Sequence, residues 1–234
     1  MRSDVPAALH GADGIGKARG NAASGQDIEM KLYDSRRAPN PRRVRWFMVE
    51  KGIDDIEIID VDLLAGDHRE PDYLSRAGLP HVPSLTVDTG ETITESIAIC
   101  RYLEAVTPLP NMFGLDSWET ALIEMWTRRA EMLAATPLMT AVRHGHPALA
   151  VLEKQSPEIA ARNRHDAEKA LKIFDARLGE SEWLGADRIT MADGVLFIAI
   201  DFARMIRFQV PEDLANVARW LSAMRARPSA SAGV

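Results

Sequence analysis

The sequence is poor in cysteine and in long apolar runs, and both shortages narrow the class of protein. Its 234 residues include a single cysteine, Cys100. No disulfide can therefore form within the chain, which fits a reducing compartment such as the cytoplasm. No apolar run reaches the roughly 18 residues that a membrane-spanning helix needs, so we expect no membrane partner. The first residues lack the apolar segment of a secretory signal.

An excess of positive charge is also missing. Acidic residues outnumber Lys and Arg by 34 to 28, giving a formal net charge of −6, which argues against a nucleic-acid backbone as partner. The hydrophobic content of 46% and charged content of 26% are ordinary for a globular protein. This length is enough to build one large or two small hydrophobic cores.

Composition and periodicity divide the chain into four parts. Residues 1–29 are rich in small and polar residues without a sustained apolar period, which predicts a disordered N-terminal extension. Residues 30–106 alternate strand and helix patterns, residues 107–115 form a proline-containing linker, and residues 116–228 are helical by period. The predicted fold class is therefore α/β followed by all-α.

The first folded part reads as βαβαββα. We expect four strands, at Met30–Asp34, Ile56–Val61, Ser84–Val87 and Glu91–Thr94. Helices are predicted from the Pro39–Pro41 turn to Lys51, loosely over Asp67–Arg76, and over Ser96–Ala105. This order predicts a small mixed sheet with helices on its faces.

Helix caps organise the second part. Ser117 and Ser156 are predicted N-caps, the latter followed by Pro157, and a break is expected near Pro137. Thr190 and Asp193 form a capping box that concerns folding rather than chemistry.

Two further expectations concern the ends of these helices. The helix after Ser156 is expected to stop at Gly179, and the last helix is expected over Glu212–Met224. The hydrophobic staple that accompanies a capping box would need an apolar residue where Gly194 stands.

The stretch around Val82-Pro83 and the Glu95-Ser96 pair carries the functional signal. A residue before proline favours extended backbone, so the N–H and C=O of Val82 can pair with a peptide-like ligand. Pro83 belongs at a strand start or turn, or in a cis bond. Ser96 opens an apolar-periodic helix, and a helix start attracts a carboxylate. Capping of that helix is the structural alternative for Ser96.

This ordered set resembles the glutathione S-transferase family, from about Met30 to Pro228. The resemblance implies a thioredoxin-like N-terminal domain, a helical C-terminal domain and glutathione as co-substrate. It also implies a small electrophile or disulfide as the other substrate, and a homodimer. In the family, the backbone at the Val82-Pro83 position pairs with the cysteinyl unit of glutathione. The Glu95-Ser96 position holds the γ-glutamyl carboxylate. The apolar faces of the Ser96 and Ser117 helices are candidate dimer surfaces.

The residue that activates the glutathione sulfur is less certain from the pattern. Alignment with the family's serine-containing motif places Ala38, which has no donor, at the serine position. A bacterial, cytosolic subgroup has an Asn after a Pro at this corner, so Asn40 and Ser35 are the catalytic candidates; Asn40 is equally a ready helix N-cap. Tyr33 is expected to pack in the core. Ala38 keeps open a non-catalytic scaffold protein on the same fold.

The remaining candidates come from the same resemblance. His68 and His81 are expected at the glycyl carboxylate, and Trp126 and Arg129 at the second substrate. We expect no metal, because His144 and His146 have no third ligand nearby. Cys100 lies on an apolar helix face and reads as a buried small hydrophobe. Arg42 and Arg43 read as a solvated face, with an anion beside this helix start as the alternative.

Overall fold

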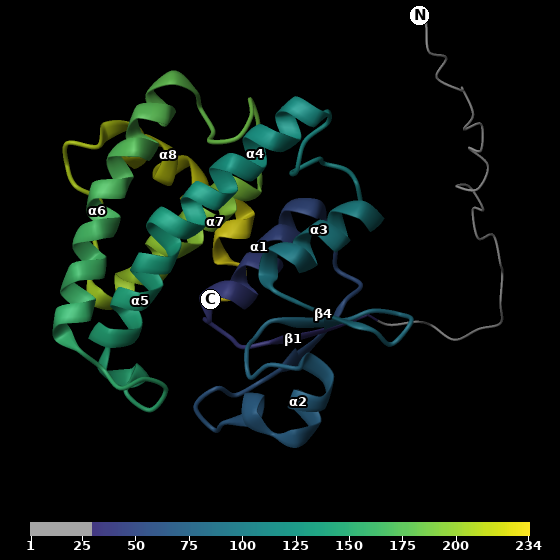
Figure 1. Cartoon of the computed structure of the whole chain (residues 1–234). Coiled ribbons are helices and arrows are strands. Elements are labelled where there is room, and N and C mark those ends of the chain that lie inside the picture. The colour runs from purple at the N-terminus through teal and green to yellow at the C-terminus, as the bar shows by residue number, and fades with distance from the viewer. Residues whose placement is uncertain (1–29) are drawn as a thin grey trace, which may run out of the picture.

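The fold is seen in a computed structural model, which describes residues 30–234 as a small sheet followed by a bundle of helices (Figure 1). The expected extension over residues 1–29 lies outside the described part. The strands are β1 (Lys31–Asp34), β2 (Glu57–Asp60), β3 (Ser84–Thr86) and β4 (Thr92–Thr94). Each of their eight ends lies within one residue of the predicted one.

The sheet has the order β2-β1-β3-β4, with β1 and β2 parallel and the other neighbours antiparallel. Leu32 of β1 lies opposite Leu85 of β3, and both are fully buried. The helices of this half are α1 (Pro39–Lys51), α2 (Pro71–Ala77) and α3 (Ser96–Val106). Figure 1 shows α1 and α3 on one side of the sheet and α2 on the other. This is the expected mixed sheet with helices on both faces.

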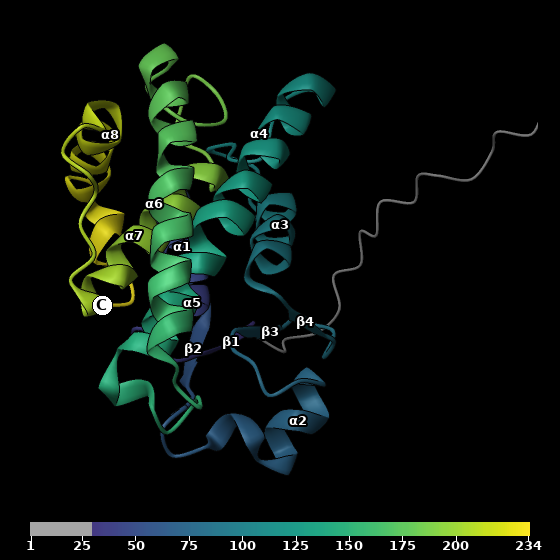
Figure 2. The ribbon, with the colours of Figure 1, turned by 60° about the vertical axis from the view of Figure 1, so that its left-hand side comes forward.

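The second half is helical, as the periodicity predicts. Its helices are α4 (Ser117–Arg129), α5 (Thr136–Gly145), α6 (Pro157–Glu180), α7 (Met191–Phe202) and α8 (Ala215–Arg225). Figure 2 shows α6 along the outside of the bundle, with α7 behind it towards α1. Ten consecutive residues of α7, Met191–Ile200, are buried, so α7 is the central helix of this half.

The break expected near Pro137 is present in a particular form. A π-helical turn, Ala130–Ala135, joins α4 to α5, and Pro137 stands in the first turn of α5. Proline has no N–H to donate to the preceding turn and its ring crowds that turn's carbonyl. The wider π-turn accommodates the proline without ending the helical path.

Two caps were predicted, and one is shifted by a residue. Ser156 caps α6 through its hydroxyl, which accepts from the N–H of Ile159 at 3.3 Å. Ser117 is not a cap; Asp116 fills that role, accepting from the N–H of Glu119 at 2.8 Å. Asp and Ser are equally good caps, so two in succession leave the sequence ambiguous.

Two predicted helix boundaries are wrong for tertiary reasons. The helix α6 continues through Gly179 to Glu180. A Cβ at Gly179 would lie 3.1 Å from Nδ2 of Asn216, which gives this glycine a packing role. Gly179 thus permits close packing of α6 on α8 and does not stop the helix. The last helix begins at Ala215, three residues after the predicted start. Its free N–H groups at Asn216 and Val217 donate to the carboxylate of Asp175 on α6.

The predicted capping box at α7 is present and fully buried. The carboxylate of Asp193 accepts from the N–H of Thr190 at 3.0 Å and from the indole N–H of Trp220 at 3.0 Å. The missing staple also has an explanation. A Cβ at Gly194 would lie 2.2 Å from the ring of Trp46, so the glycine is where α1 and α7 meet. A side chain there would separate the two halves.

Buried ion pairs reinforce α1. Lys51 donates to Glu104 of α3 at 2.6 Å, and Glu50 accepts from Arg227 at 2.6 and 2.7 Å. Arg42 is buried, so its predicted solvated position is wrong: it pairs with Asp201 of α7 at 2.6 Å. Burial alone would raise the pKa of Asp201, but hydrogen bonds from Arg42 and Arg204 bring it below its usual range.

The two helix faces proposed as dimer surfaces are used inside the chain. Ile99 and Leu103 of α3, and Ile123 and Trp126 of α4, belong to the buried apolar residues. A dimer built on those faces would have to take them from the protein's own core, so that part of the prediction is wrong.

None of the helices in residues 30–234 has the length and apolarity needed to span a membrane.

The Trp46–Gly194 contact predicts a sharp effect of one methyl group. In Gly194→Ala, the added Cβ collides with the rigid indole, and we expect the free energy of unfolding to fall by at least about 2 kcal/mol. Urea denaturation followed by circular dichroism measures this change.

Gly145→Ala is the matched control, because its Cβ meets only ordinary contacts at 3.4 and 3.5 Å. This control variant should change stability by no more than about 0.5 kcal/mol, or stabilise α5 slightly. Equal free energies of unfolding for the two variants would show that the packing of Trp46 does not require a glycine at position 194.

Candidate functional site

A cleft of about 710 Å³ lies between the sheet half and the helical half. One wall comes from the start of α1, the residues before β3 and the start of α3. The facing wall comes from α5 and from residues that follow α5 and end α7. Among the lining residues are Ser35, Asn40, His68, His81, Val82, Pro83, Glu95 and Ser96. The eight residues predicted for glutathione and its sulfur therefore share one cavity.

The β1–α1 corner, residues 35–41, lines the cleft. The N–H of Ala38 donates to the carbonyl of Ser35 at 3.0 Å, and α1 begins immediately afterwards at Pro39. Ala38 occupies the N-cap position and supplies no side-chain cap. The positive end of the α1 dipole and its free N–H groups therefore face this region.

Asn40 does not cap α1, so the capping alternative is wrong. It stands one residue inside the helix, and its Oδ1 is buried without a hydrogen-bond partner in the described part. Ser35, 8% exposed, lies at the end of β1. A buried amide with an unsatisfied atom is costly in a folded protein and calls for a ligand or water. The amide Oδ1 can only accept, whereas the amide Nδ2 makes no hydrogen bond within residues 30–234 and can donate to a bound molecule.

Val82 and Pro83 lie directly before β3 and line the same cleft. The Val82–Pro83 bond is cis, and β3 begins at the next residue. Within residues 30–234, no hydrogen bond joins the backbone of Val82 to another residue. The hydroxyl of Tyr73 donates to the carbonyl of His81 and fixes the approach to Val82. An extended backbone with free N–H and C=O groups is what a peptide-like ligand can pair with.

The turn into α3 holds its backbone in an unusual conformation. Glu95, the residue before the helix, has φ 70° and ψ 116°, outside the regions that non-glycine residues prefer. Such a conformation costs about 1–3 kcal/mol and is typical of functional sites. Ser96 is the first helical residue, 4% exposed, and makes no capping bond. The start of α3, with Glu95 and Ser96, thus lines the cleft.

His68 and His81 lie at the other end of the same wall. His68 is buried and its Nδ1 has no partner among the described residues. Burial lowers the pKa of His68, and the charge of Arg69 lowers it further. His81 is exposed on the cleft rim. Tyr33, expected in the core, is half-buried and packs its ring edge-on against Tyr73.

The predicted position of Arg43 is wrong. Predicted as part of a solvated face, it is 2% exposed. Its Nη1 lies 3.5 Å from Oγ of Ser96 and 3.5 Å from a carboxylate oxygen of Glu131, which belongs to the π-turn. Burial lowers the pKa of Arg43, and the nearby Glu131 opposes that shift. Sequence reasoning missed it because burial at this position depends on helices far along the chain.

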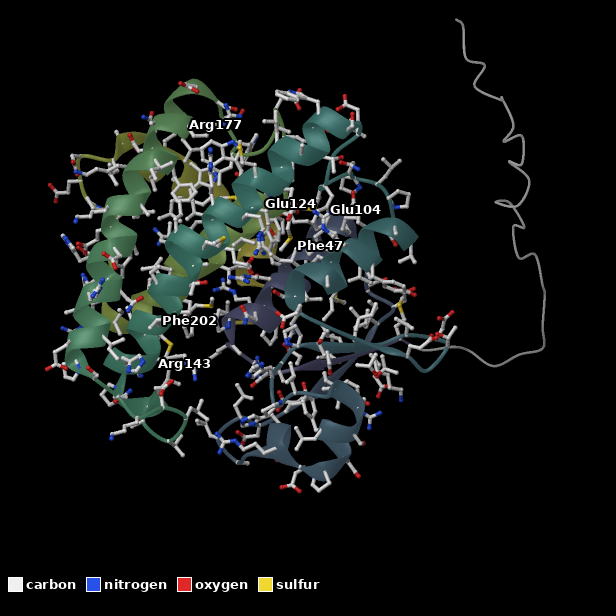
Figure 3. All side chains as sticks on the ribbon, in the orientation of Figure 1. Phe47, Glu104, Glu124, Arg143, Arg177 and Phe202 are labelled. Carbon is white, nitrogen blue, oxygen red and sulfur yellow. The ribbon has the colours of Figure 1, made fainter. Side chains whose placement is uncertain are left out.

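The helical wall uses residues that the sequence analysis did not select. Thr136, Met139, Thr140 and Arg143 line the cleft from α5, at a spacing that puts them on one helix face. This spacing of three and four residues around Pro137 is the sequence pattern that could have identified the cleft-facing side of α5. In Figure 3, Arg143 and Phe202 lie at the end of the helical half that faces the sheet. Both line the cleft.

The structure does not bring the two predicted second-substrate residues into the cleft. Trp126 is 8% exposed and packs against Phe174, 6.1 Å between ring centroids. Arg129 stacks over the same indole ring. A tryptophan of this size is buried in the bundle, which is the commoner use of such a residue.

Residues 30–234 contain no group of three or more His, Cys, Asp or Glu side chains placed to hold a metal ion. His144 and His146 use their Nδ1 atoms to accept hydrogen bonds from the N–H groups of Ser156 and Ala148. The cleft instead offers a peptide edge, two helix tips and an apolar wall.

Comparison with known families agrees with this arrangement. The family model described as "Glutathione S-transferase, N-terminal domain" matches residues 28–105, and "Glutathione S-transferase, C-terminal domain" matches residues 131–228. Together they cover more than half of the chain.

Individual relatives match over most of their length. "Glutathione S-transferase 2" of Saccharomyces cerevisiae is 31% identical over 204 residues, covering 86% of this chain and 88% of that protein. "Glutathione S-transferase 3" of Zea mays is 32% identical over 211 residues, covering 86% and 90%. The crystal structure of Gtt2 from Saccharomyces cerevisiae superposes with a TM-score of 0.79 at 30% identity, covering 85% of this chain and 97% of that one.

Cys100, near the cleft but fully buried, gives a test of the site's surroundings. Burial raises the pKa of its thiol well above the usual range, so the native protein should react with less than ~0.1 equivalent of an aromatic disulfide reagent. The same sample in concentrated denaturant should react with one equivalent. Rapid full reaction of the folded protein would show that the α3 face opens.

Proposed function

The chain belongs to the glutathione S-transferase family, and we propose that its cleft binds glutathione and activates the thiol at the Asn40 corner. It is a glutathione-dependent transferase. The observation that carries the assignment of the site is the shared cavity: the unpaired backbone of Val82 and the tip of α3 at Ser96 open into the same cleft as the start of α1. Glutathione is a small peptide with two carboxylates and one thiol, and each part has a matching feature here.

In the proposed complex, the cysteinyl unit pairs with the backbone of Val82 next to Pro83. The γ-glutamyl end lies at Glu95 and Ser96, where the α3 dipole and a free hydroxyl favour a carboxylate and the Glu95 carboxylate accepts the ammonium group. His68 and His81 face the glycyl carboxylate. This placement leaves the sulfur over the start of α1.

The chemistry follows from the state of that sulfur. The thiolate is the nucleophile, and an ordinary thiol with a pKa near 8.5 is mostly protonated at neutral pH. The α1 dipole and a hydrogen bond from the amide of Asn40 both stabilise the thiolate and so lower that pKa. We assign Asn40 the donor role and keep Ser35 as the alternative. The Pro39-Asn40 corner is similar to that of the bacterial subgroup with an Asn near the sulfur.

Two reactions use the same thiolate. With an electrophile, the sulfur forms a new S–C bond and the leaving group departs with the bonding electrons. With a disulfide, the sulfur forms a mixed disulfide with glutathione and releases the other thiolate, without a protein cysteine. Ala38 provides no hydroxyl, so a protein that binds glutathione without turnover is the remaining alternative.

The second substrate is proposed to lie against the α5 wall. Met139, Leu149 and Leu152 give that wall an apolar character suited to an organic electrophile, whereas Trp126 and Arg129 lie elsewhere. A homodimer and a cytoplasmic location complete the proposal. The family resemblance supports the first, and the single cysteine supports the second.

Glutathione binding depends on Ser96 in this proposal. Isothermal titration calorimetry should give saturable binding of glutathione to the wild-type protein. Ser96→Ala should weaken it about tenfold, because a hydrogen bond to a charged group is lost. Ser222→Ala, an exposed serine of α8 outside the cleft, should bind like wild type. No heat of binding from wild type at millimolar glutathione would contradict the assignment.

The sulfur donor can be separated from its alternative by two alanine variants. Asn40→Ala should lower kcat/KM with an aryl halide about ten- to hundredfold and raise the pKa of bound glutathione, because the thiolate loses its donor. The thiolate absorbance at different pH values measures that pKa.

Ser35→Ala serves as the comparison and should change the rate less than about threefold. Because Asn40 caps nothing, Asn40→Ala should also leave the free energy of unfolding within about 0.5 kcal/mol. A slowed Ser35 variant beside a fully active Asn40 variant would reverse the assignment. Binding without turnover of electrophiles or disulfides would favour the scaffold alternative.

A further inference from the structure

Arg43 is a buried cation whose charge the protein only partly balances. Two of its three guanidinium nitrogens, Nε and Nη2, are buried and unpartnered in the described part of the chain. The third, Nη1, reaches Glu131 only at 3.5 Å, beyond the 2.7–2.9 Å of a charge-assisted hydrogen bond. Glu131 also pairs with Arg128 at 2.6 Å, so its charge is shared.

The neighbouring buried cations make the contrast clear. Arg42 meets Asp201 at 2.6 Å, and Lys51 meets Glu104 at 2.6 Å. Both are also bonded to backbone carbonyl groups. A buried charge without a close partner is strongly unfavourable, and native proteins keep one mainly where something else completes it. Arg43 therefore calls for an anion.

Its position says where that anion binds. Arg43 projects from α1 to the underside of the α3 tip, with Nη1 3.5 Å from Oγ of Ser96. Ser96 lines the cleft on its other side. A carboxylate that accepts a hydrogen bond from the Ser96 hydroxyl is thus one side chain away from the guanidinium, in a water-poor region where charges interact strongly.

We propose that Arg43 is a positioning residue that supplies the buried counter-charge for the α-carboxylate of the γ-glutamyl unit, acting through Ser96. This inference rests on the proposed binding of glutathione. It adds a residue that does not touch the cleft and links the ligand to Glu131 of the helical half. Occupation of the site completes the charge balance of Arg43, which Glu131 and the more distant Glu95 provide only in part without ligand.

The test compares two ligands that differ in this one carboxylate. Calorimetry is done with glutathione and with 4-aminobutyryl-cysteinyl-glycine, which lacks it. Wild type should bind the analogue about 100-fold more weakly than glutathione. Arg43→Met should weaken glutathione about 30-fold but the analogue less than about threefold, because only the first ligand carries the partner charge.

Two further variants guard against a purely structural effect. Arg43→Lys keeps the charge and should bind glutathione at least about fivefold more tightly than Arg43→Met. Glu131→Gln removes the competing acid and should bind glutathione as tightly as wild type or more tightly. If Arg43→Met is poorly folded by circular dichroism, Arg43→Met with Glu131→Gln, which also removes the half-buried acid that faces position 43, replaces it.

The outcomes are distinct. Equal weakening of both ligands by Arg43→Met, or no weakening of either, would overturn the role of Arg43. A Glu131→Gln variant that binds glutathione much more weakly than wild type would also overturn it, because Arg43 would then serve Glu131. A wild-type protein that binds neither ligand would instead overturn the proposed glutathione site.

Discussion

The close contact between Trp46 and Gly194 is the constraint on which the two halves depend. Trp46 is fully buried on α1, and the missing side chain at position 194 lets its indole lie directly against the backbone of α7. α1 is thereby packed on α3 at one side and on α7 at the other. Because α1 also begins at the cleft, this contact sets the distance between the two cleft walls.

Charged residues of α1 also connect this helix to other elements. Arg42, Arg43, Glu50 and Lys51 each reach from α1 to another part of the chain, and Arg43 has the least complete set of partners. The three well-paired residues fix the helix in place, whereas the fourth lies beneath the end of α3. A single helix thus joins the rigid centre of the molecule to the place where a charged ligand is expected.

The sequence predicted the fold well wherever the signal was local. The signals at Val82-Pro83, Glu95-Ser96 and the Thr190–Asp193 box each lie in neighbouring residues, and the family resemblance is confirmed by the comparisons. The prediction failed where a residue far along the chain determines a helix boundary or the burial of a side chain. Asp175 on α6 sets the start of α8. Asp201 and residues 230–232 bury Arg42.

The candidate site divides in the same way. Eight predicted residues share the cleft because the order of elements in the sheet half brings them together, whereas the helical wall depends on which face of α4 or α5 turns inward. Periodicity alone gives both helices an apolar face without saying which neighbour covers it. The family resemblance predicts Trp126 at the cleft, and periodicity cannot correct that prediction, although Phe174 packs against Trp126 in the bundle.

The bonds around Arg42 and Arg37 have a consequence for how the protein is made. The guanidinium of Arg42 donates to the carbonyl groups of Ala230 and Ala232, 188 and 190 residues later. The N–H of Arg37 donates to the carbonyl of Gly233. A ribosome delivers the β1–α1 corner long before those partners. The sheet half can therefore form early during translation, but the β1–α1 corner of the cleft acquires its final shape only when residues 230–233 dock. Such long-range closure is slow compared with helix formation.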